Sequence, residues 1–256
     1  MSLKVFITGA SSGIGAALAR VYAARGATLA LLGRREDALR AFQASLPGEH
    51  AVYVADVAEP EALALAARDF ISKHGLPDVV IANAGVSAGT LSEERSDLAV
   101  FERILKTNLL GMAATFQPFI VPMRRERRGQ LVGISSVAGV RGLPGASAYS
   151  ASKAAVSRYL ESLRVEMRGS GVSVTEIRPG YIRTPMTDVN GYRMPFIIDA
   201  DDAAVRFISA IERAPARATI PWQMACVAPL LASLPAWLYD RLAAGAGRKP
   251  RNLPRL

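Results

Sequence analysis

Short runs of apolar residues alternate with longer stretches of helical periodicity along most of the chain. The apolar runs predict seven buried strands, at residues 3–7, 28–32, 51–55, 79–82, 129–134, 173–177 and 218–220. The intervening pattern predicts helices, among them residues 16–25, 97–125, 154–167 and 199–214. Strands that alternate with helices are typical of a parallel sheet covered on both faces. The pattern therefore predicts a doubly wound α/β fold built on a seven-stranded parallel sheet.

A glycine-rich segment separates the first predicted strand from the first predicted helix. It contains Gly9, Ser11, Ser12, Gly13, Ile14 and Gly15. Glycine lets the backbone turn tightly and lets a phosphate approach the chain. Free amides at the start of the helix favour the negative charge of that phosphate. The segment predicts a phosphate-binding loop for a nucleotide cofactor.

Two arginines follow the second predicted strand, in the segment Gly33-Arg34-Arg35. In dinucleotide-binding folds, an acidic residue at this place binds the ribose 2′-hydroxyl of NAD, whereas an arginine accommodates the 2′-phosphate of NADP. The strand ends without a carboxylate, so the segment predicts NADP(H) and disfavours NAD(H). The alternative is that both arginines are solvated residues at the start of a helix.

The third and fourth predicted strands also end in polar or small residues. Asp56, followed by Val57, is placed to accept a hydrogen bond from an adenine amino group; it could also cap the helix after Pro60, and both roles can hold. Asn83-Ala84-Gly85 follows the fourth strand, and its small residues would let a cofactor ribose lie against the backbone.

The fifth strand leads into a set of residues suited to acid–base chemistry. Tyr149 and Lys153 are four residues apart on a predicted helix, so they share a face, and Ser136 ends the preceding strand. A nearby cation favours a phenolate, so we expect Lys153 to lower the pKa of Tyr149 and make it a usable acid or base. Ser136 would hold the same substrate oxygen. Taken alone, a Tyr and a Lys at this spacing are more often surface residues.

Further features surround this edge of the predicted sheet. Asn108 lies in the middle of the predicted helix 97–125, where asparagine is unfavourable. After the sixth strand, Pro179 directs the chain and Gly180 allows close approach. Residues 186–198 mix Gly, Pro and aromatic residues, which predicts a flexible lid that covers the crevice. The alternative is an ordinary surface loop. The carboxyl ends of parallel strands meet in one crevice, where ligands bind.

Composition narrows the functional classes. The 256 residues are half hydrophobic, which suits a single domain spanning residues 1–256, and the net charge of +9 is compatible with an anionic cofactor. The basic residues are scattered and no nucleic-acid-binding motif occurs. The single cysteine, Cys226, is expected to be a buried reduced thiol in the cytoplasm. His50 and His74 lack ligand spacing, so no metal site is expected.

The segment 218–239 holds no charged residue. Its first residues belong to the last predicted strand, and an apolar C-terminal extension begins at about residue 223. It is long enough to span a bilayer, but Pro221, Pro229 and Pro235 interrupt it, so a membrane span is not expected. We expect its apolar face to meet a partner subunit or the substrate pocket. Peripheral membrane contact, helped by the basic C-terminus, is a third possibility.

Taken together, residues 3–222 resemble the short-chain dehydrogenase/reductase family, whose members have the Rossmann fold. Segment 8–15 resembles the family's TGxxxGxG motif, and Asn83-Ala84-Gly85 resembles the end of its NNAG motif, with Ala82 as a departure. Ser136 precedes Tyr149 by the family's thirteen residues, segment 149–153 matches YxxxK, and Pro179-Gly180 matches the PG motif.

The resemblance implies a role for each matched position. Tyr149 would be the acid/base, Ser136 would polarise the carbonyl, Lys153 would hold the nicotinamide ribose, and Asn108 would support a water-linked proton relay to Lys153. Asp56 and Val57 fall where the family contacts adenine, and Ile182 and Thr184 where it contacts the nicotinamide amide. The family also implies a homodimer or homotetramer that uses the helices around Asn108 and Tyr149.

The sequence therefore predicts an enzyme that transfers hydride between NADP(H) and a small-molecule carbonyl or alcohol. One alternative is a non-catalytic NADP-binding sensor or regulatory protein on the same fold; its signature would be loss of Ser136, Tyr149 or Lys153, and all three are present. Another is a peripheral-membrane reductase of lipid-like carbonyls, which rests on the apolar extension.

Overall fold

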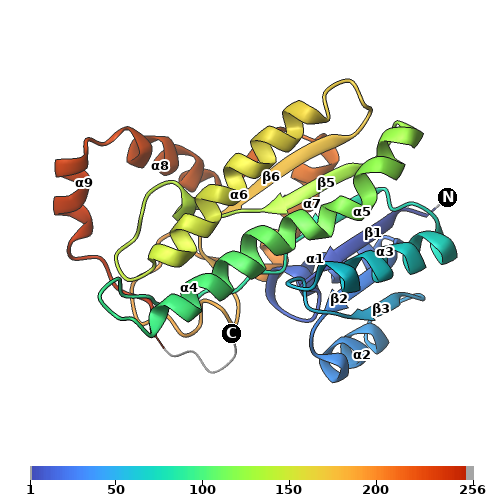
Figure 1. The fold of residues 1–256 in the computed structure, drawn as a ribbon, viewed down its shortest axis with the longest axis horizontal. Helices are drawn as coiled ribbons and strands as arrows, with labels where there is room; N and C mark the ends of the chain where they lie inside the picture. Colours follow the sequence, from blue (N-terminus) through green and yellow to red (C-terminus); the bar gives the residue numbers. More distant parts are fainter. Residues whose placement is uncertain (1, 252–256) are drawn as a thin grey trace.

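A seven-stranded parallel sheet forms the centre of the computed structural model, which describes residues 2–251 (Figure 1). The strand order is β3-β2-β1-β4-β5-β6-β9. The strands are β1 Lys4–Thr8, β2 Thr28–Gly33, β3 Ala51–Val54, β4 Val79–Ala82, β5 Gln130–Ile134, β6 Ser173–Pro179 and β9 Arg217–Ile220. All seven predicted strands are present, and their ends differ from the prediction by at most two residues. The predicted α/β architecture is confirmed.

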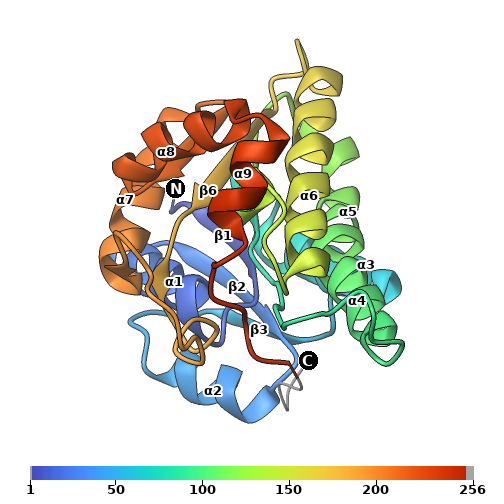
Figure 2. The same cartoon turned by 90° about the vertical axis from the view of Figure 1, so that its left-hand side faces the viewer.

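Helices cover both faces of this sheet. They are α1 Gly13–Ala24, α2 Glu36–Ala44, α3 Pro60–His74, α4 Asp97–Leu105, α5 Gly111–Glu126, α6 Ser147–Glu166, α7 Ala200–Arg213, α8 Trp222–Ser233 and α9 Ala236–Ala243. Figure 2 shows α1 and α7 on one side of the sheet and α3, α5 and α6 on the other. The helices α8 and α9 were not predicted from the sequence, and α2 appeared only in the alternative that Arg34 and Arg35 begin a helix.

Two apolar cores separate the sheet from its helix layers. Val5 and Ile7 of β1 lie in the core beneath α1 and α7, whereas Phe6 lies in the core beneath α3 and α5. Successive residues of a strand point to opposite faces, so a strand covered on both sides must be apolar throughout. The continuous apolar runs in the sequence follow from this double burial.

The long predicted helix 97–125 is interrupted by a π-helical turn. Residues Lys106–Leu110 form this turn between α4 and α5. Asn108 lies within it and is fully buried. π-turns inside helices frequently occur at functional sites. The turn gives a structural reason for an asparagine at the middle of an otherwise regular helix.

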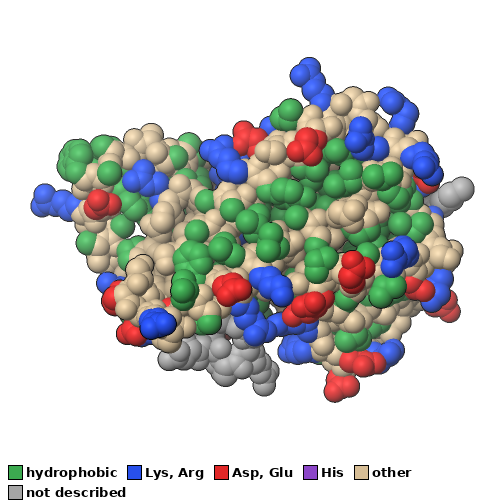
Figure 3. Space-filling view, viewed as in Figure 1, with side chains coloured by type: hydrophobic (Ala, Val, Ile, Leu, Met, Phe, Trp, Pro, Cys, Tyr) green, Lys and Arg blue, Asp and Glu red, His purple; other side chains and the backbone are tan. Residues whose placement is uncertain are grey.

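The apolar C-terminal extension forms α8 and α9 at one end of the molecule (Figure 1). Met224 and Ala228 of α8 are buried against Val137, and Trp222 and Trp237 are each 69% exposed. Figure 3 shows hydrophobic side chains on the outer surface of this end. None of the helices in residues 2–251 is long and apolar enough to cross a membrane.

The prediction that Cys226 is buried is wrong, since its side chain is exposed on α8. The inward face of α8 is occupied by Met224 and Ala228, which are four residues apart. Residues midway between two such positions lie on the opposite side of a helix. The thiol therefore points outward.

The segment predicted as a lid, residues 186–198, is mostly irregular. Its end forms β8 Ile198–Asp199, which pairs in parallel with β7 Ile182–Arg183. This two-stranded sheet was not predicted, because strands of two residues leave no periodic pattern. It ties the end of the segment to the chain that leaves β6.

Candidate active site

Ser136, Tyr149 and Lys153 meet at the carboxyl end of the sheet. β5 ends at Ile134 and is followed directly by Ser136, whereas Tyr149 and Lys153 lie in the first two turns of α6. The Ser136 hydroxyl is near enough to the Tyr149 phenol to act on its pKa. Lys153 Nζ lies 5.9 Å from the centroid of the Tyr149 ring. The structure therefore brings together the three side chains that the sequence predicts to meet.

The predicted lowering of the Tyr149 pKa by Lys153 is wrong for the protein alone. Burial raises the pKa of Tyr149, and the nearby Ser136 hydroxyl only partly offsets this. The Lys153 ammonium donates to the carbonyl of Ile134, at 2.8 Å, and burial lowers its own pKa to about 8. Desolvation disfavours the charged form of each group, and it is the largest cause of both pKa shifts.

Asn108 is held by the chain that follows β4. Its Oδ1 accepts from Val86 N at 2.8 Å, and its Nδ2 donates to Val86 O and to Ser152 Oγ, both at 3.0 Å. A Cβ placed on Gly85 would lie 3.2 Å from Asn108 Oδ1 and 3.7 Å from Lys153 Nζ. Asn108 and Lys153 therefore approach the backbone at Gly85 from two different helices.

The glycine-rich loop makes a close turn at the start of α1. Gly9 has a φ of 67°, and a Cβ on Gly15 would lie 2.2 Å from Gly9 O. Only glycine accommodates this approach without a shift of the backbone. The side chain of Ile14, by contrast, packs against the core beneath α1.

The amides at the start of α1 are available to an external acceptor. The N-cap residue Ser12 makes no side-chain hydrogen bond to them, and no acidic residue lies in the first turn. The first amides of a helix have no partner within the helix, and they carry the positive end of its dipole. This end of α1 has the features of a phosphate-binding site.

Asn83 joins the end of β4 to the glycine-rich loop. Its Nδ2 donates to Thr8 O at 3.0 Å and to Gly9 O at 3.3 Å. The amide of Ala84 donates to Thr8 Oγ1 at 3.2 Å. The side chain of Asn83 therefore stabilises the loop, while the backbone of 83–85 borders the site.

Arg34 and Arg35 follow β2 beside this loop. Arg35 Nη2 lies 3.4 Å from Ser11 Oγ, and Arg34 Nη1 lies 3.5 Å from Asp56 Oδ2. Both arginines are exposed. The guanidinium of Arg35 is thus directed at the glycine-rich loop, and that of Arg34 at the end of β3.

Asp56 and Val57 lie just beyond β3. Asp56 Oδ1 accepts from Ala58 N at 2.9 Å within a turn, and the N-cap of α3 is Glu59, so the alternative role of Asp56 as that cap is wrong. Val57 is 5% exposed and packs against Gly111 of α5. Asp56 is therefore open to the site, whereas the Val57 side chain belongs to the core.

The chain that leaves β6 is positioned by its neighbours. Pro179 is the last residue of β6, and Gly180 N donates to Ile220 O at 2.8 Å. A Cβ on Gly180 would lie 2.7 Å from Met224 Cγ. The close approach predicted at Gly180 is thus made by α8.

Ile182 and Thr184 follow this turn and return toward the glycine-rich loop. Ile182 is buried in the core. The Thr184 methyl lies 3.3 Å from the position of a Cβ on Gly13, and its amide donates to Thr187 Oγ1 at 3.0 Å. Thr184 therefore borders the start of α1, whereas Ile182 holds the segment in place.

A buried carboxylate behind the site was not predicted. Glu176 of β6 is 3% exposed and accepts from Ser135 Oγ at 2.7 Å and Ser157 Oγ at 2.6 Å. It also pairs with Arg178 and Arg217. Glu176 joins the end of β5, next to Ser136, to the middle of α6. A charged residue inside an apolar strand was the one signal in the sequence that could have identified it.

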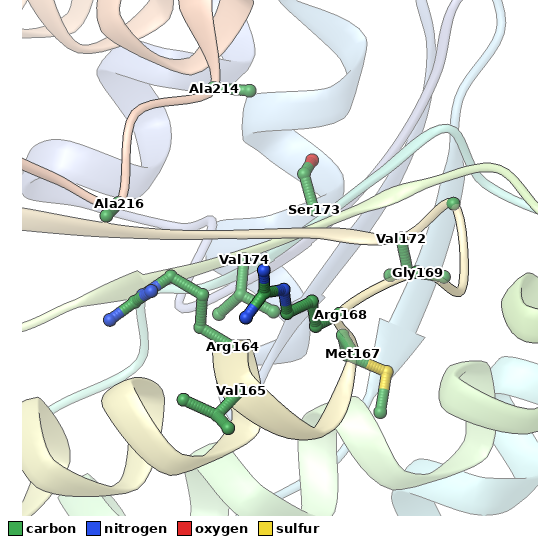
Figure 4. Close-up of a pocket in the computed structure, with 11 residues that line it drawn as sticks. Arg164, Val165, Met167, Arg168, Gly169, Val172, Ser173, Val174, Ala214 and Ala216 are labelled. Atoms are coloured by element: carbon green, nitrogen blue, oxygen red, sulfur yellow. The ribbon is translucent and has the colours of Figure 1, made fainter.

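Figure 4 shows a cavity at the end of the sheet opposite the candidate active site. Its volume is about 440 Å³. It is lined by the end of α6, the start of β6, and Ala214 and Ala216. Because Ser173 is the first residue of β6, this cavity adjoins the amino ends of the strands, away from Ser136. It takes no part in the candidate active site.

Comparisons with known proteins agree with this arrangement. Residues 4–193 match the family described as short chain dehydrogenase. An uncharacterized oxidoreductase of Myxococcus xanthus is 40% identical over 93% of this chain and 94% of that protein. Dehydrogenase/reductase SDR family member 7B of Bos taurus is 34% identical over 97% of this chain and 82% of that protein.

Solved structures show the same fold. A short-chain dehydrogenase from Streptomyces avermitilis has a TM-score of 0.81 at 27% identity, over 96% of this chain and 99% of that chain. An alcohol dehydrogenase from Thermococcus sibiricus, complexed with 5-hydroxy-NADP, has a TM-score of 0.75 at 26% identity, over 86% and 96% of the two chains. With the family match spanning the glycine-rich loop and the Ser136–Tyr149–Lys153 cluster, this chain belongs to the short-chain dehydrogenase/reductase family and is an oxidoreductase.

Proposed function

We propose that this protein transfers hydride between NADP(H) and a small-molecule carbonyl or alcohol, with Tyr149 as the acid/base. The observation that carries the proposal is that Ser136 and the Lys153 ammonium both lie beside Tyr149, at the carboxyl end of the sheet. When bound, the nicotinamide supplies or accepts the hydride. The residues of this chain bind and orient the substrate oxygen and move its proton.

Tyr149 and Ser136 act on the same substrate oxygen. Because burial raises the pKa of Tyr149, its phenol stays protonated at neutral pH and can donate its proton to a carbonyl oxygen. The Ser136 hydroxyl donates a second hydrogen bond to that oxygen and fixes its position. In the reverse direction, the phenolate accepts the proton of an alcohol.

Lys153 and Asn108 support this proton transfer. We assign to Lys153 the nicotinamide ribose and the return of a proton to Tyr149; a lysine pKa of about 8 suits proton exchange near neutral pH. Asn108 would hold a water that links Lys153 to solvent. The approach of both side chains to Gly85 supports this assignment.

The cofactor assignment rests on the loop after β1 and the arginines after β2. The uncapped amides of α1 suit the pyrophosphate, and the close turn between Gly9 and Gly15 leaves the backbone exposed to it. Asp56 would bind adenine, the backbone of 83–85 the ribose, and Thr184 the nicotinamide amide. Arg34 and Arg35 would bind the 2′-phosphate of NADP.

We expect a higher kcat/KM with NADPH than with NADH. In Arg35→Ala the ratio of the two kcat/KM values should fall by about tenfold or more, because a charge-assisted hydrogen bond contributes about 1.5–3 kcal/mol. Steady-state assays with both cofactors measure the ratio. The matched control is Arg40→Ala on α2, an exposed arginine paired with Glu36, which should leave the ratio unchanged. Equal efficiency of the native protein with NADH and NADPH would refute the assignment.

We also propose a homodimer or homotetramer that buries the outer face of α4 and α5. Leu98, Leu110 and Val121 are each more than 60% exposed there, and Figure 3 shows hydrophobic side chains along this face. Light scattering should give two or four times the chain mass of 27.2 kDa. Leu110→Asp should lower that mass, whereas Val205→Asp on α7 should not. A monomeric native protein contradicts the proposal.

A further inference from the structure

The C-terminal strap, residues 247–251, crosses between three loops at the carboxyl end of the sheet. The amide of Gly89, in the loop after β4, donates to Pro250 O at 2.9 Å. Gly145, in the loop before α6, packs against the side chain of Arg248. Figure 2 shows the end of the chain running down from α9 across this region. The strap therefore contacts the loops that follow β4 and β5.

The third loop is the segment that follows β6. Gly247 packs so closely against Tyr192 that a Cβ would lie 2.3 Å from Tyr192 Cβ. Tyr149 is near enough to Tyr192 to contribute to the raised pKa of that phenol, after the larger effect of burial. These three loops also carry or adjoin Gly85, Ser136 and Tyr149. The strap thus bridges the loops that border the candidate active site.

An ion-pair clamp holds the strap in this position. Arg251 donates to both carboxylate oxygens of Asp97, at 2.9 and 3.1 Å, and reaches Glu94 at 3.4 Å. Asp97 is 5% exposed and also accepts from Leu91 N at 2.8 Å. A bidentate pair of this kind fixes the relative orientation of the two side chains and also stabilises their contact. The strap is therefore fixed to the start of α4.

Lys249 is a buried cation within this strap. It is 9% exposed, and its Nζ donates to the carbonyl of Met186 at 2.8 Å. Within residues 2–251 no carboxylate pairs with it, and the two carboxylates that hold the strap, Asp97 and Glu94, are engaged by Arg251. Burial lowers the pKa of Lys249 to about 8. Buried charges in proteins are normally paired, and among residues 2–251 this one has no carboxylate partner.

We propose that Lys249 binds an anionic oxygen group of the substrate. An ammonium has three donors, and the Met186 carbonyl takes one, which leaves two for a carboxylate or a phosphate. The preceding residue of the strap, Arg248, is exposed and carries a second positive charge. The proposed substrate is therefore a carbonyl compound or an alcohol that also carries a carboxylate or a phosphate group. The inference rests on the proposed function, because it names the substrate class of the same site.

The first test compares matched pairs of neutral and anionic substrates. The pairs are 4-acetylbenzoate with its methyl ester, 4-oxopentanoate with its methyl ester, and dihydroxyacetone phosphate with dihydroxyacetone. We expect kcat/KM to be at least about tenfold higher for the anion of a pair, mainly through a lower KM. In Lys249→Met this ratio should fall to near one. Lys249→Arg should retain it, and so should Lys73→Met, an exposed lysine on α3.

Two outcomes overturn the inference. One is a ratio near one for every pair with the native protein. The other is a Lys249→Met variant in which both members of a pair lose activity equally, which would make Lys249 a structural tie between the strap and Met186. A weaker NADPH affinity in Lys249→Met with an unchanged ratio would assign the ammonium to the cofactor and likewise contradict the inference.

Ligand binding provides a readout that is independent of turnover. The anion of the preferred pair should raise the melting temperature of the native protein and of Lys73→Met, but not of Lys249→Met. A Lys249-dependent shift with no turnover on any pair would support the inference and contradict the proposed function. Turnover of the neutral substrates without any anion-dependent shift would support the proposed function and contradict the inference.

Discussion

Tyr149→Phe should lower kcat by about 10²–10⁴-fold on a verified substrate, because it removes the proton donor and leaves the ring in place. Binding of NADPH should change little, since the phenol acts on the substrate oxygen. Stopped or continuous assays of NADPH absorbance give kcat, and NADPH fluorescence titration gives the dissociation constant. The fold should be unaffected, because the aromatic ring still packs at the start of α6.

A second tyrosine provides the matched control. Tyr53→Phe removes a hydroxyl that donates to Asp69 at 2.8 Å on the outer part of the sheet. It should leave kcat within about twofold of the native value, because a change of less than about 0.4 kcal/mol in the barrier is expected far from the site. If Tyr149→Phe retained native turnover, the acid/base assignment would be wrong.

Glu176→Gln should lower the free energy of unfolding by about 3 kcal/mol, the lower end of the cost of breaking a buried ion pair. The amide keeps the shape of the side chain, but it leaves Arg178, which is 13% exposed, next to a neutral group. The amide also cannot accept on both terminal atoms, so a bond to Ser135, Ser157 or Arg217 is lost. Urea unfolding of both proteins measures the difference.

The control for this prediction is Glu161→Gln on α6. Its carboxylate is 44% exposed and pairs with Arg158 at three residues' distance. Exposed pairs of this kind contribute about 0–1 kcal/mol. Equal losses of stability in Glu161→Gln and Glu176→Gln would mean that the buried cluster contributes no more than a surface pair.

The contribution of Glu176 to the free energy of unfolding should also depend on pH. Burial tends to raise its pKa, but the hydrogen bonds from Ser135, Ser157 and Arg217 and the charge of Arg178 outweigh this and hold the pKa below its usual value of 4.5. A lowered pKa in the folded state contributes stability that is present above the unfolded value and is lost as the pH falls through the folded value. The stability difference from Glu176→Gln should therefore be full above about pH 4.5 and shrink below it.

Local sequence patterns determined the sheet and the position of the candidate site. Strands covered on both faces must be apolar at every position, so the seven runs could be found from the sequence. The carboxyl ends of parallel strands share one edge, so the residues that end or follow them could be placed together. Ser136, Tyr149 and Lys153 meet for this reason, because each is tied to a strand end or to the first turns of the helix beyond it.

Tertiary structure alone decided what surrounds those residues. Burial in the folded protein raises the pKa of Tyr149, whereas the opposite shift was predicted from its helical neighbour Lys153. Cys226 is exposed because of how α8 rotates against Val137, and no pattern within α8 specifies that rotation. The clamp between Asp97 and Arg251 joins residues 154 positions apart. Such contacts depend on where the chain returns in space, which local periodicity and motif spacing do not encode.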